Sequence, residues 1–355
     1  MSVQLYQIRL KGVTMDNYQP LYGGGYDPLT VSKPEKKAIK KQLSDTFIMC
    51  LASDILMTII AVAAFVLMEV FGYEFRTNES GQQIMDWQYS LAASLPSVLL
   101  CVLMFLCDKS MNKIKTADYL RTDRMKGSFI PAFIGVCMFS YAVALGLQAL
   151  ITGAFSLFDW SPLSESFYYE TDLTPAFLAQ ELLTTVVLAP IAEELMFRGV
   201  VLRRLSKVSQ SFGIIVSALF FGLMHGNILQ TALGFVIGVV FAYADIKAGS
   251  LLPSIIGHMF INASATVSSF VEYFFGENAA GTVWMIMILL YFIVGLIVSL
   301  VLIFGKKIKW PANTEYHRKR TLPLMLTCIS FWLLMALYIY NVVDSTGPLT
   351  DLMKE

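Results

Sequence analysis

Residues 176–205 read AFLAQELLTTVVLAPIAEELMFRGVVLRRL, a mostly apolar run that carries a cluster of charges in its second half. A helix of roughly 20 residues spans the ~30 Å hydrocarbon core of a bilayer, so the run is long enough to cross a membrane. An ionisable side chain inside the bilayer costs roughly 2.5–3.5 kcal/mol on insertion scales. The charges Glu193, Glu194 and Arg198 therefore require a structural or functional reason.

Eight further apolar segments flank this run. The chain of 355 residues is 56% hydrophobic and only 15% charged, whereas a soluble domain carries about a quarter charged residues. The segments lie at roughly 46–71, 88–107, 128–156, 211–225, 228–246, 250–274, 282–304 and 322–342. The pattern predicts an all-α fold, a polytopic transmembrane helical bundle of about eight to nine segments. Because no loop is long enough for a separate soluble domain, function must lie in the membrane region.

The charges of the loops alternate along the chain. Loops 108–127 and 305–321 are rich in Lys and Arg, whereas loops 72–87 and 157–175 are acidic. The positive-inside rule then predicts a cytoplasmic N-terminus and an external C-terminus. Net charge is zero, which gives no electrostatic reason to expect a nucleic-acid partner. The five cysteines have no metal-type spacing and are interpreted as apolar packing residues.

The three charges of the fourth segment are not equivalent. In a helix Glu194 and Arg198 are four residues apart and share a face, so they can form an ion pair. Glu193 lies about 100° away around the helix and is left free for chemistry. The alternative is an interhelical ion network that uses all three charges for structure alone.

Two of the three histidines lie in or at the end of apolar segments, whereas His317 falls in a basic loop. A single buried histidine is more often a satisfied core residue, but two near a Glu-Glu pair favour a site. His258 and Asn262 are four residues apart and can present N–H donors to one point, as a tetrahedral oxyanion requires. His225 ends a short segment that would place it far from the others if it spanned fully. Either this segment stops part-way, with its turn inside the protein, or its boundaries are shifted; we expect a water-accessible cavity that opens toward the cytoplasm.

Taken in order, these residues resemble the CPBP intramembrane protease family, which includes CAAX prenyl endopeptidases and bacterial bacteriocin-processing relatives. The resemblance covers about residues 176–275. Its motifs EExxxR, FxxxH and HxxxN fall on Glu193, Glu194 and Arg198, on Phe221 and His225, and on His258 and Asn262. It implies that Glu193 and His225 activate a water molecule and that His258 and Asn262 stabilise the oxyanion. Glu194 and Arg198 would hold the site together, with Phe221 in a supporting position.

We therefore expect an intramembrane endopeptidase that hydrolyses a peptide bond of a protein or peptide in or at the membrane, in the plasma membrane of a bacterium. The expected regions are a polar cytoplasmic tail over 1–45, N-terminal transmembrane helices over 46–175, a catalytic core over 176–275 and C-terminal helices with a tail over 276–355. The core takes in the fourth to seventh segments.

Two alternatives remain open. Glu193, His225 and His258 are an acceptable zinc set with an open position for water, although no HExxH pair supplies a preformed chelate and the metal-free mechanism is favoured. The chain could also be a catalytically silent scaffold, an immunity or regulatory protein, or a transporter, since transporters place charges near the membrane midplane too.

Overall fold

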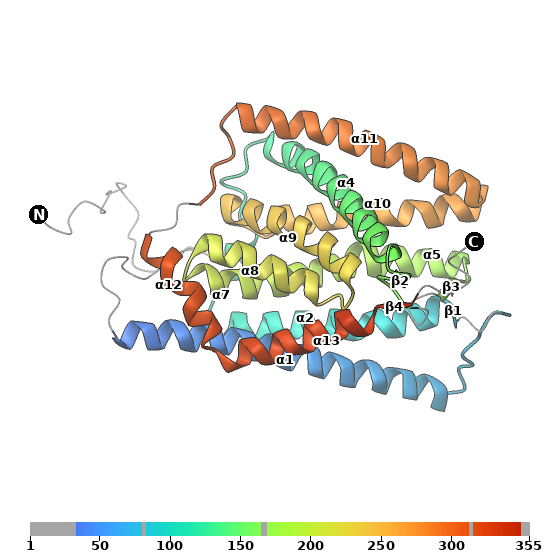
Figure 1. The fold of residues 1–355 in the computed structure, drawn as a ribbon, viewed down its shortest axis with the longest axis horizontal. Coiled ribbons are helices and arrows are strands. Elements are labelled where there is room, and N and C mark those ends of the chain that lie inside the picture. The colour runs from blue at the N-terminus through green and yellow to red at the C-terminus, as the bar shows by residue number, and fades with distance from the viewer. Residues whose placement is uncertain (1–32, 80–82, 165–168, 312–314, 349–355) are drawn as a thin grey trace, which may run out of the picture.

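The computed structural model describes residues 33–79, 83–164, 169–311 and 315–348 and is a bundle of helices (Figure 1). The expected all-α polytopic fold is confirmed. Of the described helices, six are long and apolar enough to cross a membrane: α1 (Lys33–Val70), α2 (Trp87–Met111), α4 (Phe129–Ser156), α9 (Ile228–Ala248), α10 (Leu252–Phe275) and α11 (Glu277–Phe304). Most of the expected polar tail lies outside the described residues, and its last part is the beginning of α1.

The fourth apolar segment is an unbroken helical rod that changes its winding. It consists of α5 (Pro175–Glu181), the π-helical η2 (Leu182–Leu188), α6 (Ala189–Met196), the π-helical η3 (Phe197–Leu202) and α7 (Arg203–Ser206). The rod begins after Thr174, whose hydroxyl oxygen accepts a hydrogen bond from the Phe177 amide. Pro175 occupies the first helical position. Pro190 has no amide hydrogen and crowds the carbonyl four residues earlier, and the wide η2 turn immediately before it relieves both problems.

A short hairpin follows the rod. Helix α8 (Gln210–Leu223) has 14 residues, about 21 Å, and therefore ends before it could cross a bilayer. Ser209 caps α8, and Asn227 caps α9 after a tight turn. Because the segment stops part-way, the structure supports the first of the two explanations offered for the position of His225.

Glycines allow the two hairpin helices to cross closely. A Cβ atom added to Gly234 would lie 2.8 Å from the Cα atom of Gly222, closer than real side chains come. This contact places the end of α8, which carries Phe221 and leads into the turn with His225, firmly against α9.

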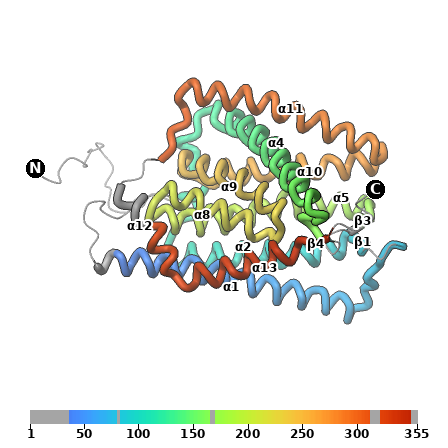
Figure 2. The backbone as a smooth tube through the Cα atoms, in the orientation of Figure 1, coloured from blue at the N-terminus to red at the C-terminus, as the bar shows by residue number. Residues whose placement is uncertain are grey.

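The remaining helices enclose the rod and the hairpin. Helices α4 and α11 pack together along one edge of the bundle, and α1 and α13 (Ile329–Asp344) run side by side along the opposite edge (Figures 1 and 2). The ninth segment is divided into α12 (Glu315–Leu326) and α13, because Pro323 lies in α12 and Cys328 has an extended backbone. The short α3 (Thr116–Tyr119) lies in the loop after α2.

Two small strand pairs connect the loops at one end of the bundle. Strand β1 (Gln83–Met85) pairs in parallel with β3 (Tyr169–Thr171), and β2 (Trp160–Ser161) pairs antiparallel with β4 (Gly347–Pro348). The β1–β3 pair joins the two acidic loops, and the Arg76 guanidinium contacts the Asp172 carboxylate across it at 2.6 Å. At the opposite end, the Leu251 amide donates to the Tyr119 carbonyl, which connects the basic loop after α2 to the start of α10.

Candidate active site

Two fully buried charges form the foundation of the site. Glu194 in α6 and Arg198 in η3 have no solvent exposure, and Nε of Arg198 lies 3.1 Å from Oε2 of Glu194. The Arg198 Nη1 group also donates to Oε1 of Glu194 at 3.1 Å, and Nη2 donates to the Gly238 carbonyl of α9 at 3.4 Å. The ion pair expected from the spacing of these residues is therefore present.

Aromatic rings enclose the guanidinium of Arg198. Its Cζ atom lies 4.3 Å from the centre of the Phe221 ring and 5.5 Å from that of Phe241. A desolvated cation over an aromatic face is stabilised by the ring quadrupole. Arg198 thus joins three helical elements, the rod, α8 and α9, at one buried point.

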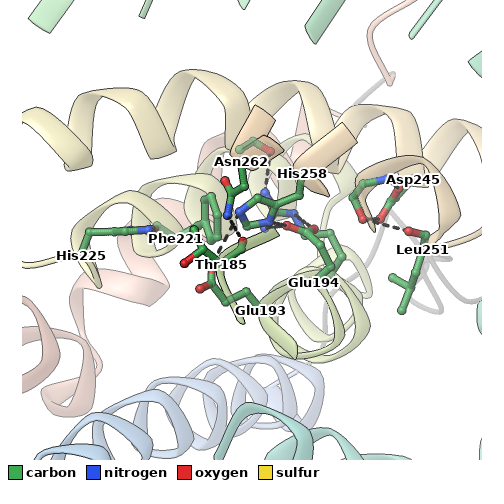
Figure 3. A network of polar contacts seen from close by, with 12 residues as sticks. Thr185, Glu193, Glu194, Phe221, His225, Asp245, Leu251, His258 and Asn262 are labelled. Carbon is green, nitrogen blue, oxygen red and sulfur yellow. Dashed lines mark hydrogen bonds and ion pairs between the residues drawn. The ribbon is translucent and has the colours of Figure 1, made fainter. Parts of the chain in front are cut away.

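His258 lies between the two carboxylates (Figure 3). Its Nδ1 atom is 2.9 Å from Oε1 of Glu194, and its Nε2 atom is 3.9 Å from Oε2 of Glu193. The same Oε1 atom accepts from Arg198, so in the contact with His258 it is the acceptor and Nδ1 is the donor. The other ring nitrogen, Nε2, then faces Glu193.

Glu193 has no such partner. Its Oε2 atom is enclosed and accepts no hydrogen bond, although 14% of the side chain is exposed. The separation of 3.9 Å from His258 is too long for a direct hydrogen bond. Of the two neighbouring carboxylates, one is balanced by Arg198 and the other remains available.

Asn262 lies one turn after His258 in α10 but contacts a different acceptor. Its Nδ2 group donates to the carbonyl of Thr185, in the π-helical η2, at 2.7 Å. In this arrangement the Thr185 carbonyl occupies the Asn262 amide, and the expected role of Asn262 as a second oxyanion donor beside His258 stays a prediction. A π-helical turn disturbs the regular hydrogen-bond ladder, and Asn262 fixes α10 to that turn.

His225 lies apart from this cluster, on the other side of Phe221 (Figure 3). Its Nδ1 group donates to the Phe221 carbonyl at 2.9 Å, so Nε2 is the ring nitrogen that could contact other groups. The Phe221 ring is edge-on to both imidazoles, with centroids 5.4 Å from His225 and 5.5 Å from His258. The phenyl ring therefore separates the two histidines.

The zinc alternative requires Glu193, His225 and His258 to converge. Within the described part of the chain, no three His, Cys, Asp or Glu side chains are grouped so that they could hold a metal ion. In this arrangement His225 lies apart from Glu193 and His258, on the other side of the Phe221 ring.

One buried residue near the site was not identified from the sequence. Asp245 of α9 is fully buried and accepts hydrogen bonds from the Ser254 amide at 3.0 Å and the Ser254 hydroxyl at 2.6 Å. It thereby holds the beginning of α10 and sets the height of His258. The sequence did contain a signal that could have identified Asp245. It is an acidic residue at the end of an apolar segment and is followed by Gly249 and a serine.

Residues 175–264, from α5 into α10, match the family model described as type II CAAX prenyl endopeptidase Rce1-like. This match confirms the resemblance to the CPBP family that the three motifs indicated. The chain is also 27% identical over 139 residues to an Escherichia coli protein described as an uncharacterized 24.3 kDa protein. That alignment covers 38% of this chain and 57% of the other protein. No solved structure matches the chain.

Proposed function

We propose that this protein is an intramembrane endopeptidase of the CAAX-protease type, in which Glu193 is the general base. One observation carries the proposal: the Oε2 atom of Glu193 accepts no hydrogen bond and lies 3.9 Å from the Nε2 atom of His258. One water molecule can hydrogen-bond both atoms at about 2.8 Å. The family match over residues 175–264 supports peptide hydrolysis as the reaction.

The chemistry follows from the charges around these groups. Glu193 takes a proton from the water molecule while the water oxygen attacks the scissile carbonyl. Glu193 later gives that proton to the leaving amine. His258 acts as an imidazolium held by Glu194, and its Nε2–H group donates to the oxyanion that forms. Arg198 pairs with Glu194, which in turn contacts His258, so Glu194 and Arg198 position His258 and do not contact the substrate.

The roles of Asn262 and His225 require movement. Asn262 would leave the Thr185 carbonyl to become a second oxyanion donor. His225 would assist Glu193 once the Phe221 ring or the turn after α8 has moved, because the ring now separates it from the other groups.

The substrate is a protein or peptide held in or at the membrane, since the site is enclosed by membrane-length helices. His258 is six residues into α10, about 9 Å from the end of the bundle that carries the basic loops. We place that end in the cytoplasm of a bacterial cell, with the N-terminus on the same side.

The test is the variant Glu193→Gln in cells, with Glu181→Gln as a matched control on the same helical rod. Glu181 contacts Ser269 at 3.4 Å and lies outside the cluster of Glu193, Glu194 and His258. Proteomics of membrane and medium should reveal peptides or precursors that accumulate with Glu193→Gln and not with Glu181→Gln. Unchanged processing at normal protein level would refute the peptidase and favour a catalytically silent scaffold. Loss of cleavage by the wild type after treatment with a strong chelator, restored by zinc, would refute the metal-free mechanism.

A further inference from the structure

The loop after α11, residues 305–311, carries several positive charges beside two large apolar side chains. Lys306, Lys307 and Lys309 are all exposed. Ile308 and Trp310, which alternate with them, are also exposed, by 43% and 50%. The loop begins where α11 ends and leads toward α12 at one end of the bundle (Figure 1).

Tyr243, near the end of α9, holds this loop in place. Its hydroxyl accepts a hydrogen bond from the Lys309 amide at 3.0 Å and donates one to the Lys309 carbonyl at 3.1 Å. Its ring stacks on that of Trp310, with centroids 6.0 Å apart and planes within 13°. The Ser211 hydroxyl, in the first turn of α8, donates to the Pro311 carbonyl at 3.0 Å. The loop is thus fixed to both helices of the hairpin.

A fourth lysine joins the three of the loop. Lys247 is one helical turn after Tyr243, and its ammonium group lies 5.6 Å from the centre of the Tyr243 ring. Because Tyr243 and Lys309 are 66 residues apart in the chain, it is the fold that gathers these charges. Asp245 is near in the chain, but it is fully buried and bonded to Ser254.

No carboxylate within the described ranges neutralises this cluster, because none of its four lysines takes part in an ion pair there. Tryptophan and tyrosine are enriched where a bilayer meets water, since their rings lie at the level of the lipid headgroups. Lysine clusters that directly follow a membrane helix attract anionic headgroups. A partner that suits both the charges and the exposed apolar side chains is therefore an anionic phospholipid.

We propose that this cluster binds the phosphate headgroup of an anionic phospholipid, at the end of the bundle that carries the basic loops. Its members are Tyr243, Lys247, Lys306, Lys307, Lys309 and Trp310. The ammonium groups contact the phosphate, while the Trp310 ring and Ile308 pack against the adjoining part of the acyl chains. This site is separate from the proposed peptidase site and does not depend on it.

The test measures lipid binding by the full-length protein in neutral detergent micelles, by native mass spectrometry. The probes are phosphatidylglycerol and phosphatidylcholine with identical acyl chains. Phosphatidylglycerol should bind about tenfold more tightly. Added salt should reduce this preference, because exposed charges are screened. Equal binding of the two lipids would overturn the proposal.

Two triple variants separate a local site from the general charge of this end. The first neutralises three lysines of the cluster: Lys247→Gln, Lys307→Gln and Lys309→Gln. The matched control neutralises three exposed lysines of the basic loop after α2: Lys113→Gln, Lys115→Gln and Lys126→Gln. The first should reduce the preference to about twofold, and the control should retain it in full. An equal loss in both, or no loss in the first, would refute a local site.

Tyr243→Phe tests the arrangement without changing any charge. It removes the hydroxyl that bonds both the amide and the carbonyl of Lys309. Affinity for phosphatidylglycerol should fall about threefold. An undiminished affinity would show that the lysines need no fixed arrangement, which would refute the site as described.

The same phosphate chemistry occurs in soluble phosphate esters, so glycerol 1-phosphate serves as a competitor. It should not displace phosphatidylglycerol, because it lacks the acyl chains that contact Trp310 and Ile308. Displacement at equal concentration would indicate a site for soluble phosphate esters and would overturn the lipid site. Lipid binding is measured without cleavage, so its failure leaves the peptidase proposal intact, and the absence of cleavage leaves the lipid site intact.

Discussion

Arg198→Ala tests the buried foundation of the site, because it removes one half of a fully enclosed ion pair. Breaking a buried pair by truncating one partner typically destabilises a protein by about 3–5 kcal/mol, since the remaining charge has no compensation. Here His258 still bonds Glu194 at 2.9 Å and can take up a proton, which places this contribution near the lower limit, about 3 kcal/mol. The lost contact of the guanidinium with Phe221, at 4.3 Å, adds about 1 kcal/mol.

The expected loss is therefore about 4 kcal/mol of the free energy of unfolding. It can be measured by reversible unfolding of the purified protein in mixed micelles, and in cells it should appear as low abundance. Arg198→Lys is the matched control: it keeps the charge but loses the planar fork, and we expect a smaller loss of about 1–2 kcal/mol.

A double-mutant cycle distinguishes the ion pair from simple packing. In Arg198→Ala with Glu194→Gln the buried charge is gone, so the double variant should be more stable than Arg198→Ala alone by about 2 kcal/mol. The reasoning would be refuted if the losses in free energy of unfolding of Arg198→Ala and Glu194→Gln added up to that of the double variant within about 0.5 kcal/mol. Normal stability of Arg198→Ala would refute it as well.

Other predictions concern the surrounding structure and the chemistry. Asp108→Asn should lower protein abundance in a fluorescence assay of membrane fractions, because the buried Asp108 carboxylate balances Arg203 and Arg204; normal abundance would contradict this. Gly234→Ala should destabilise the protein by about 1–3 kcal/mol in micelle unfolding, because its Cβ would lie 2.8 Å from a backbone atom of the paired helix. In helix α4 a Cβ at Gly146 meets nothing within 4 Å, so Gly146→Ala is the control and should be neutral or slightly stabilising; equal effects of the two would be evidence against the close crossing. His258→Ala should lower peptide turnover by a factor of about 10² to 10³, measured as the rate of product release, and an undiminished rate would exclude it as an oxyanion donor.

The sequence was sufficient to predict the class of fold and the pairing of Glu194 with Arg198. Both depend on local spacing: apolar runs of membrane length, and two opposite charges one helical turn apart. It also identified Glu193 as the unpaired carboxylate, because its neighbour already had a partner.

The remaining features depend on how helices meet, which one-dimensional spacing does not contain. Asn262 shares a helical face with His258, yet the Thr185 carbonyl of a π-helical turn occupies its amide. The Phe221 ring separates the two histidines only because α8 crosses α9 closely at Gly222 and Gly234. The widening of the rod before Pro190 and the height of the turn after α8 likewise emerge only in three dimensions.

The seam between α1 and α13 has a consequence for biosynthesis. Ser44 and Ser330, which meet across it, are 286 residues apart in the chain. At about 5–20 residues per second, a ribosome needs about 15–60 s between the two. During that interval Ser44 lacks its partner Ser330, and Phe47 has its ring contact with Phe220 of α8 but lacks the one with Phe331. Helix α1 is thus completed by α13, so a nascent chain that stalls before α13 leaves Ser44 without its partner and this side of α1 uncovered. Such a stalled chain offers the cell's quality-control proteases a clear mark of incomplete synthesis.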